Sequence, residues 1–108
     1  MLILHIKKTW FDMILSGEKK EEYREIKPYY RSRLINEGFL DRYGLPTIWQ
    51  GHVLFRNGYS KQSPAFEALC TVDIRTGKPE WGAEPGKEYY VLKIIGDIQV
   101  ISQKNDPE

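Results

Sequence analysis

The sequence has little cysteine, little net charge and no long apolar run. Its one cysteine, Cys70, excludes an internal disulfide, so a hydrophobic core must hold the fold together. The formal net charge of +1 excludes a strongly basic nucleic-acid clamp. The apolar run at residues 1–4 is too short for a signal-peptide core or a membrane span. We therefore expect a cytoplasmic protein that does not enter the membrane.

The length and the apolar content indicate one globular unit. The chain has 108 residues, near the commonest domain length, and 41% of them are hydrophobic. We find no repeat, no internal linker and no low-complexity block. The sequence predicts one domain over residues 1–102, and the polar residues 103–108 read as a disordered tail.

The first third of the chain predicts a strand followed by a short helix. Alternating apolar residues indicate a strand over residues 2–6. Thr9 is a good helix N-cap, with Asp12 three residues on in a weak capping box. Gly17 is the expected stop, so the predicted helix covers about residues 9–16.

The rest of the chain predicts one more helix among several strands. Residues 21–26 form a candidate strand, Pro28 is placed to open a helix, and Gly38 to close it. Three further strands are expected at residues 48–56, 66–75 and 89–101. The last should bend or bulge at Gly96. This order predicts an α+β fold, with a mostly antiparallel sheet that can close into a small β-barrel.

One segment brings ionisable side chains together. Gly17 lets the chain turn sharply towards Lys19, while Glu22 and Arg24 lie two apart on a strand and share a face; Tyr23 points the other way. Arginine offers a fork of donors, glutamate accepts hydrogen bonds, and a lysine beside arginine has reason to lower its pKa. An ordinary surface strand with Lys and Glu pairs across it would have the same spacing.

Residues 17–24 resemble the GxKxxExR signature of the ASCH domain, a family of the PUA-like superfamily. The placement is similar too, with a strand, a short helix and then the motif leading into the next strand. Residues 55–59, with the sequence FRNGY, resemble a segment of small stand-alone ASCH proteins of prokaryotic or phage type. The similarity extends over most of the chain.

This resemblance implies a PUA-like β-barrel with two or so flanking helices and a cleft over the motif that binds RNA or a nucleotide. The ligand-binding residues it implies are Gly17, Lys19, Glu22, Arg24, Arg56, Asn57 and Tyr59. In this reading Arg56 meets a phosphate and Tyr59 stacks on a base. A simpler reading is that Asn57 only makes the turn and Tyr59 only covers the barrel rim.

A second branch of the family implies catalysis. It hydrolyses N4-acetylcytidine, keeps the Lys and Arg that match Lys19 and Arg24, and has Thr at the position of Glu22. The alternative function is therefore a hydrolase of a modified nucleoside or of RNA, with Lys19 as base or nucleophile and Glu22 as its partner in proton transfer. Candidates for a further catalytic Glu are Glu67, Glu80 and Glu84. A third alternative is a protein-interaction module in transcription regulation.

The remaining candidate residues favour structural roles. His5 and His52 are the only histidines, and with Cys70 they form no metal-ligand spacing, so we expect neither a metal nor a cofactor. Cys70 lies in an apolar strand and is expected to be a small buried side chain. Aromatic candidates for a stacking surface are Tyr29, Tyr30, Trp49 and Trp81. The first two are favoured because basic residues flank them.

Overall fold

The computed structural model describes residues 1–102 and contains one five-stranded sheet and two α-helices. The elements are β1 (Leu2–His5), α1 (Lys8–Leu15), β2 (Glu21–Arg24), α2 (Pro28–Asn36), β3 (Gly51–Arg56), β4 (Ala65–Thr76), the 3-10 helix η1 (Pro79–Trp81) and β5 (Glu88–Ser102). The tail predicted at residues 103–108 lies outside the described part. Neither of the two described α-helices is long and apolar enough to cross a membrane.

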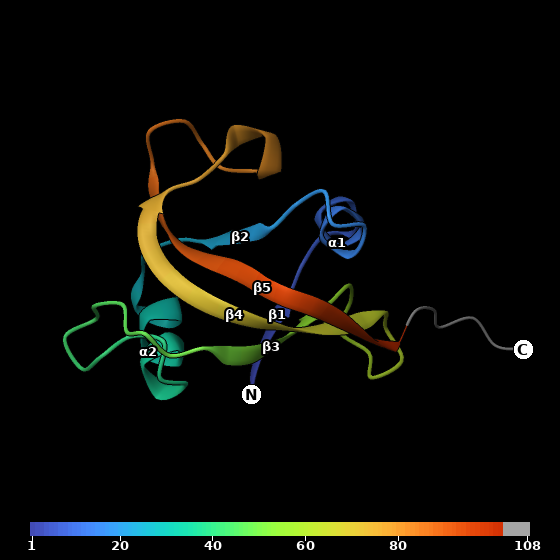
Figure 1. Cartoon of the computed structure of the whole chain (residues 1–108), viewed down its shortest axis with the longest axis horizontal. Coiled ribbons are helices and arrows are strands. Elements are labelled where there is room, and N and C mark those ends of the chain that lie inside the picture. Colours follow the sequence, from blue (N-terminus) through green and yellow to red (C-terminus); the bar gives the residue numbers. More distant parts are fainter. Residues whose placement is uncertain (103–108) are drawn as a thin grey trace, which may run out of the picture.

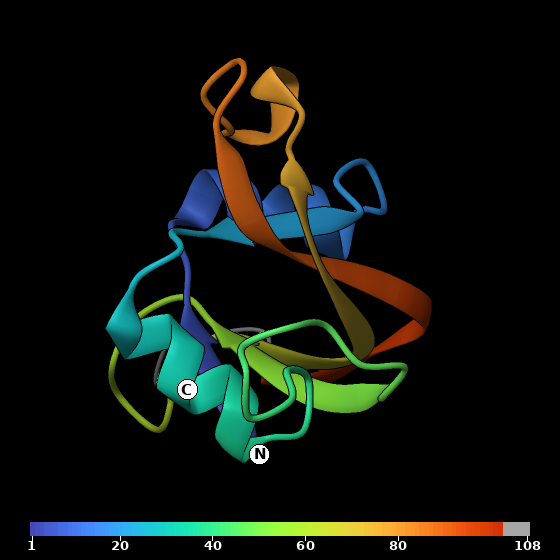
Figure 2. The same ribbon diagram turned by 90° about the vertical axis from the view of Figure 1, so that its left-hand side faces the viewer.

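The sheet has the strand order β1-β3-β4-β5-β2. Only β1 and β3 pair in parallel, so the mostly antiparallel sheet of an α+β fold is confirmed. The long strands β4 and β5 curve across the molecule and wrap the sheet into a half-barrel (Figures 1 and 2). The sheet does not close, because no ladder joins its edge strands β1 and β2 within residues 1–102.

The predicted irregularity in the last strand is confirmed. Ala68 pairs with Ile98, whereas the next residue of β4 pairs with Ile95, so Gly96 and Asp97 are extra residues on β5. Gly96 has a φ of +79°, a conformation that glycine adopts without strain. A bulge of this kind bends a strand and increases its twist, which contributes to the curl of the sheet.

The predicted cap of the first helix is wrong. α1 begins at Lys8, so Thr9 lies inside the first turn; the N-cap is Lys7, and no side chain within residues 1–102 caps the helix. Asp12 instead accepts a hydrogen bond from the Lys8 ammonium at 2.7 Å. The buried side chain of Phe11 fixes the rotation of the helix on the sheet, and this packing outweighs the N-cap preference.

Two strand ends also differ from expectation. β3 begins at Gly51 rather than at residue 48, and Ile48 is 99% exposed, so its apolar character does not mark a strand. β2 ends at Arg24 because the chain must turn before Pro28, which opens α2 as predicted. A residue before proline is restricted in conformation, and the turn uses up the last two positions of the predicted strand.

The main core fills the inner face of the half-barrel. α1 contributes Phe11 and Ile14, α2 contributes Leu34, and the sheet supplies most of the remainder. Cys70 lies in the middle of β4 with no exposed surface, as predicted. Burial raises the pKa of this thiol to about 12, so it is not an activated nucleophile.

A smaller apolar cluster lies on the outer face of β2 and β5. Ala83, Tyr89 and Val91 form it, and Tyr23 packs against it. Residues 77–87 fold over this face at the top of Figure 1. The backbone passes so close to Tyr23 that a Cβ at Gly77 would lie 2.6 Å from the Tyr23 ring. This packing fixes the position of η1, which reaches the candidate site.

Candidate ligand-binding site

A tight turn after α1 places the first residue of the site. Gly17 has a φ of +88°, as expected for a residue that ends a helix, and the Lys19 amide donates to the Met13 carbonyl at 2.9 Å. The chain therefore reverses and brings Lys19 back beside the helix. Apart from its two neighbours in the chain, no residue of the described part lies within 4 Å of the place where a Cβ on Gly17 would be, so Gly17 serves the turn.

The pairing of β2 decides which of its side chains face inward. Glu22 pairs with Leu92 and Arg24 with Tyr90, so both project from the core face of the sheet. Tyr23 lies on the other face, as the spacing predicted. Because β2 is an edge strand, its inward side chains reach the open edge of the half-barrel.

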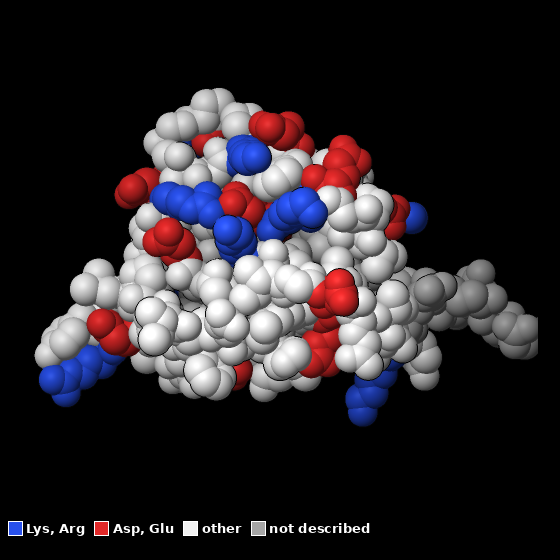
Figure 3. Space-filling model, in the orientation of Figure 1, with Lys and Arg blue, Asp and Glu red and all other residues white. Residues whose placement is uncertain are grey.

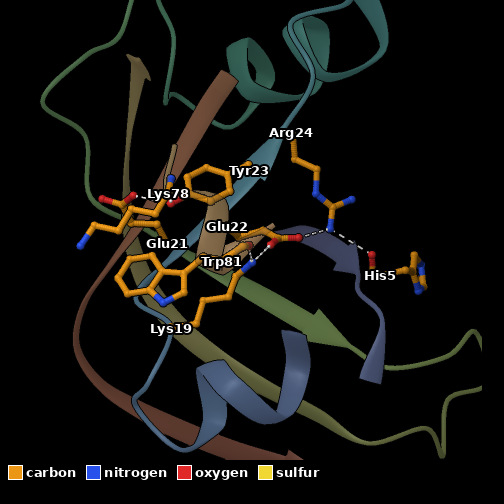
Figure 4. Close-up of polar contacts among 8 residues, drawn as sticks. All are labelled: His5, Lys19, Glu21, Glu22, Tyr23, Arg24, Lys78 and Trp81. Atoms are coloured by element: carbon orange, nitrogen blue, oxygen red, sulfur yellow. Dashed lines mark hydrogen bonds and ion pairs between the residues drawn. The ribbon is translucent and has the colours of Figure 1, made fainter. Parts of the chain in front are cut away.

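Glu22 lies between two cations, as Figure 4 shows. Its Oε1 is 3.1 Å from the Lys19 Nζ, and its Oε2 is 2.7 Å from the Arg24 Nη2. The Lys19 ammonium also donates to the Trp81 carbonyl, and the Arg24 Nη2 donates to the His5 carbonyl at 3.0 Å. The carboxylate is thus held from both sides, and Arg24 links β2 to β1.

The cluster is buried and carries a positive charge. The side chains of Lys19, Glu22 and Arg24 are 1%, 8% and 15% exposed. Burial lowers the pKa of Lys19, and Glu22 opposes this effect only in part. Burial would also lower the pKa of Arg24, but Glu22 and Tyr30 raise it overall. With all three side chains ionised, the cluster has one net positive charge.

A cleft of about 440 Å³ opens over this cluster, between the β1–α1 connection and β2. Its charged and aromatic lining residues are Lys7, Trp10, Glu22, Tyr23, Arg24, Glu25, Lys27, Tyr30 and Tyr89. Three cations and two carboxylates line it, so its lining is also positive by one charge. The cleft occupies the edge where the sheet stays open.

The four motif positions do not all reach the cleft. Glu22 and Arg24 line it directly. Lys19 lies behind Glu22 with its ammonium 4.4 Å from the centre of the Trp10 ring, and it does not line the cleft. Gly17 borders a different hollow, beside the bulge of β5. The structure brings Lys19, Glu22 and Arg24 together and leaves Gly17 apart.

Of the site residues predicted in the FRNGY segment, only Tyr59 lines a pocket near the cleft. The Asn57 side-chain amide donates to the Ile6 carbonyl at 3.0 Å, which ties the ends of β1 and β3 together. The Tyr59 ring stacks on the His5 ring with 4.1 Å between centroids, and both line a pocket next to the cleft. Arg56 lines neither space, and its Nε has no hydrogen-bond partner among residues 1–102.

Sequence reasoning missed part of the lining. Neither Trp10 nor Lys7 is among the site residues predicted from the sequence, yet both line the cleft. The signal that could have found them is their position just after an edge strand. Tyr30, which the sequence favoured as a stacking residue, lines the cleft, whereas Trp49 and Trp81 do not.

The three candidates for a further catalytic Glu lie outside the cleft. Glu67 pairs with His52 at 3.0 Å, and neither Glu67 nor the exposed Glu80 and Glu84 line the cleft. Glu25 does line it. No three His, Cys, Asp or Glu side chains within residues 1–102 are grouped so that they could hold a metal ion.

The fold and the site define a small α+β half-barrel with a polar cleft, flanked by aromatic side chains, at its open edge. Comparisons of the chain with models of protein families, with curated proteins and with solved structures find no match. The resemblance to the ASCH domain therefore depends on the motif at residues 17–24, the FRNGY segment and the order of elements.

Proposed function

We propose that this chain is an ASCH-like domain of PUA-like fold that binds a nucleotide, or an unpaired base of RNA, in the cleft. The observation that carries the proposal is the buried cluster of Lys19, Glu22 and Arg24. It holds one carboxylate and one guanidinium at the cleft surface, each fixed by ion pairs and hydrogen bonds. Fixed polar groups in a concave site recognise small ligands with little loss of side-chain entropy.

The lining suits a nucleobase. A carboxylate has about four acceptor sites, so Glu22 can accept a hydrogen bond from an exocyclic amine in addition to its two contacts. Trp10 and Tyr30 are aromatic residues of the cleft lining, and stacking of a base on such a ring contributes about 1–3 kcal/mol. Lys7 and Lys27 add positive charge for a phosphate.

The charge distribution favours a small ligand over a long RNA. On the face seen in Figure 3, Lys and Arg side chains lie among Asp and Glu side chains and form no surface of one sign. The cleft volume of about 440 Å³ falls in the range of about 300–1,000 Å³ that is typical of small-molecule sites. Both features favour a nucleotide or a short single-stranded segment.

A thermal-shift screen tests the proposal, with nucleosides, nucleotides, N4-acetylcytidine and short RNAs as ligands. We expect one class to raise the Tm, because a ligand at 100 times its Kd adds about 2.7 kcal/mol to the stability. The double variant Lys7→Gln/Lys27→Gln should reduce this shift. Its matched control, Lys8→Gln/Lys20→Gln, removes two exposed charges outside the cleft lining and should keep it. No shift with any class, or an equal loss in both variants, contradicts the proposal.

The second candidate function is a hydrolase of a modified nucleoside or of RNA. The lowered pKa of Lys19, next to a carboxylate that lines the cleft, favours it, because such a lysine can act as a base or nucleophile. In the described conformation, however, Glu22 and the Trp81 carbonyl bind the ammonium, and a substrate has to displace these contacts to reach it. Product formation by the wild type, lost in Lys19→Met, would support this function. Absence of turnover by the wild type would exclude it for the substrates tried.

A protein-interaction module in transcription regulation is the third candidate. Such a module is expected to expose a contiguous apolar surface and does not need a polar cleft. Exposed apolar side chains do occur in the loop between α2 and β3, namely Tyr43, Leu45, Ile48 and Trp49. The burial of Lys19 and Glu22 at a concave site nevertheless favours a small polar ligand.

A further inference from the structure

A second, smaller pocket adjoins the cleft. Its volume is about 160 Å³, and it shares three lining residues with the cleft: His5, Arg24 and Tyr30. Tyr29 and Arg33 of α2 and Tyr59 of the β3–β4 loop also line it. The two spaces therefore border the same three side chains, with Arg24 at their junction.

The polar groups of this pocket suit an anion. Arg24 and Arg33 line it together with three tyrosines, and no Asp or Glu within residues 1–102 lines it. The Arg33 guanidinium lies 3.5 Å from the centre of the Tyr29 ring, and its Nη1 donates to the Tyr29 carbonyl at 3.2 Å. This stacking orients the planar group and leaves most of its five N–H donors for a ligand.

Arg24 is held rigidly at the junction. Its Nη2 donates to Glu22 and to the His5 carbonyl, and its Nη1 donates to the Tyr30 hydroxyl at 3.2 Å. Its Nε is buried and has no acceptor among the residues that the structure describes. A guanidinium fixed in this way presents its charge at a constant position between the two spaces.

The size of the pocket limits what it can hold. A volume of about 160 Å³ is well below the range of about 300–1,000 Å³ that is typical of sites for whole small molecules, and it suits a group of the size of a phosphate. We propose that this pocket binds the phosphate of a nucleoside monophosphate whose base lies in the cleft. The inference rests on the proposed function, and it narrows the ligand from a nucleotide or an unpaired base of RNA to a nucleoside monophosphate whose phosphate lies in this pocket.

Calorimetric titration with the four ribonucleosides and with their 5′- and 3′-monophosphates tests the inference. The variants are Arg33→Gln and, as a matched control on the same helix, Arg31→Gln, which removes an exposed charge outside the lining of this pocket. We expect one monophosphate to bind at least about tenfold more tightly than its nucleoside, as a charge-assisted bidentate contact allows. Arg33→Gln should weaken the monophosphate about tenfold and leave the nucleoside unchanged. Arg31→Gln should alter neither.

The outcomes separate this inference from the proposed function. If a nucleoside and its monophosphates bind equally, or if Arg33→Gln weakens both to the same extent, the phosphate pocket is refuted while the cleft remains a nucleoside site. If Arg31→Gln weakens the monophosphate as much as Arg33→Gln does, the effect is one of general charge, and the pocket is again refuted. If no nucleoside or monophosphate binds, the inference fails, and of the proposed function only the binding of an unpaired base of RNA remains.

Discussion

At the scale of single residues, the balance of charge in the buried cluster depends on Glu22. It is the carboxylate shared by the buried Lys19 and the partly buried Arg24. Loss of one partner from a buried ion pair leaves an uncompensated charge, which is more costly than loss of the whole pair. Removal of Glu22 leaves two cations without a carboxylate, whereas removal of Lys19 or Arg24 leaves Glu22 paired with the other cation.

We predict that Glu22→Gln destabilises the protein far more than Lys19→Met. The Gln variant leaves two cations together and turns an amide N–H₂ towards one of them, so we expect a loss of about 3 kcal/mol. Lys19→Met leaves Glu22 paired with Arg24 and costs about 1 kcal/mol for the Trp81 carbonyl that loses its donor. Urea unfolding measures both, and Lys20→Met controls for loss of an exposed lysine. Equal losses in the two variants would show that the cluster does not share its charge as described.

The sequence predicted the residues of this cluster but not their surroundings. Gly17 and the two-residue spacing on β2 are local signals, and both predictions from them are confirmed. The contact between Lys19 and Trp81 joins residues 62 positions apart, and no local pattern reports it. This contact contributes to the deep burial of Lys19, which therefore could not be foreseen from the segment alone.

At the scale of elements, β2 is an edge strand held by polar contacts on its outer face. Arg75 of β4 donates to both carboxylate oxygens of Glu21, at 3.3 and 2.6 Å, and Tyr23 donates to the same carboxylate at 2.7 Å. The Lys78 amide in turn donates to the Tyr23 hydroxyl at 3.0 Å. These contacts tie the strand that carries the site to β4 and to the loop over it.

We predict that this anchor weakens in acid. Burial alone would raise the pKa of Glu21, but the hydrogen bonds from Arg75 and Tyr23 lower it overall, below its usual 4.5. A lowered pKa means that the unfolded chain binds more protons, so the contribution to stability is complete above pH 4.5 and is lost as the pH falls through the folded-state pKa. Because Arg75 is partly exposed, the contribution should not exceed about 1 kcal/mol.

Urea midpoints at pH 7, 4.5 and 3 measure this effect. Glu21→Gln should be less stable than the wild type at pH 7, and the difference should shrink below pH 4.5. Arg75→Gln removes the partner of the carboxylate and should show the same trend. A difference that stays constant from pH 7 to pH 3 would mean that the carboxylate adds no pH-dependent stability.

The bounds of the elements were predictable where glycine or proline set them. Pro28 opens α2, and Gly96 marks the bulge, because these residues restrict or release the backbone itself. The errors at Thr9 and Ile48 arose where the signal was a side-chain preference. Tertiary packing overrides such preferences, since a cap contributes only about 1 kcal/mol.

At the scale of the whole molecule, the site exists because the sheet remains open. Sequence patterns predicted the strands, but the degree of closure depends on the lengths and curvature of β4 and β5, which have 12 and 15 residues. The edge strands β1 and β2 are linked through the Arg24 side chain and the His5 carbonyl. The cleft lies at this seam, so its position is a property of the whole sheet.

We predict that ligand affinity depends weakly on salt and does not increase with RNA length. The net charge is only +1, and the two guanidinium groups of the phosphate pocket can neutralise one or two phosphates. For single strands the slope of log affinity against log salt is about −0.7 per neutralised phosphate, so we expect a value from about −0.7 to −1.4. Anisotropy titrations with labelled RNAs of increasing length check this. A slope that steepens with length would indicate an extended basic track.

The position of Cys70 makes its reactivity a probe of how often the sheet opens. The thiol lies on the central strand between Gly51 of β3 and Ile94 of β5, and a reagent meets it only when these strands separate. The rate at which a thiol reagent modifies Cys70 therefore reports how often the sheet opens. No other cysteine in the chain contributes to the signal. A ligand that joins the two sides of the seam makes those openings rarer. Binding of a ligand in the cleft, at the edge of the sheet, should therefore slow the modification of Cys70 at its centre.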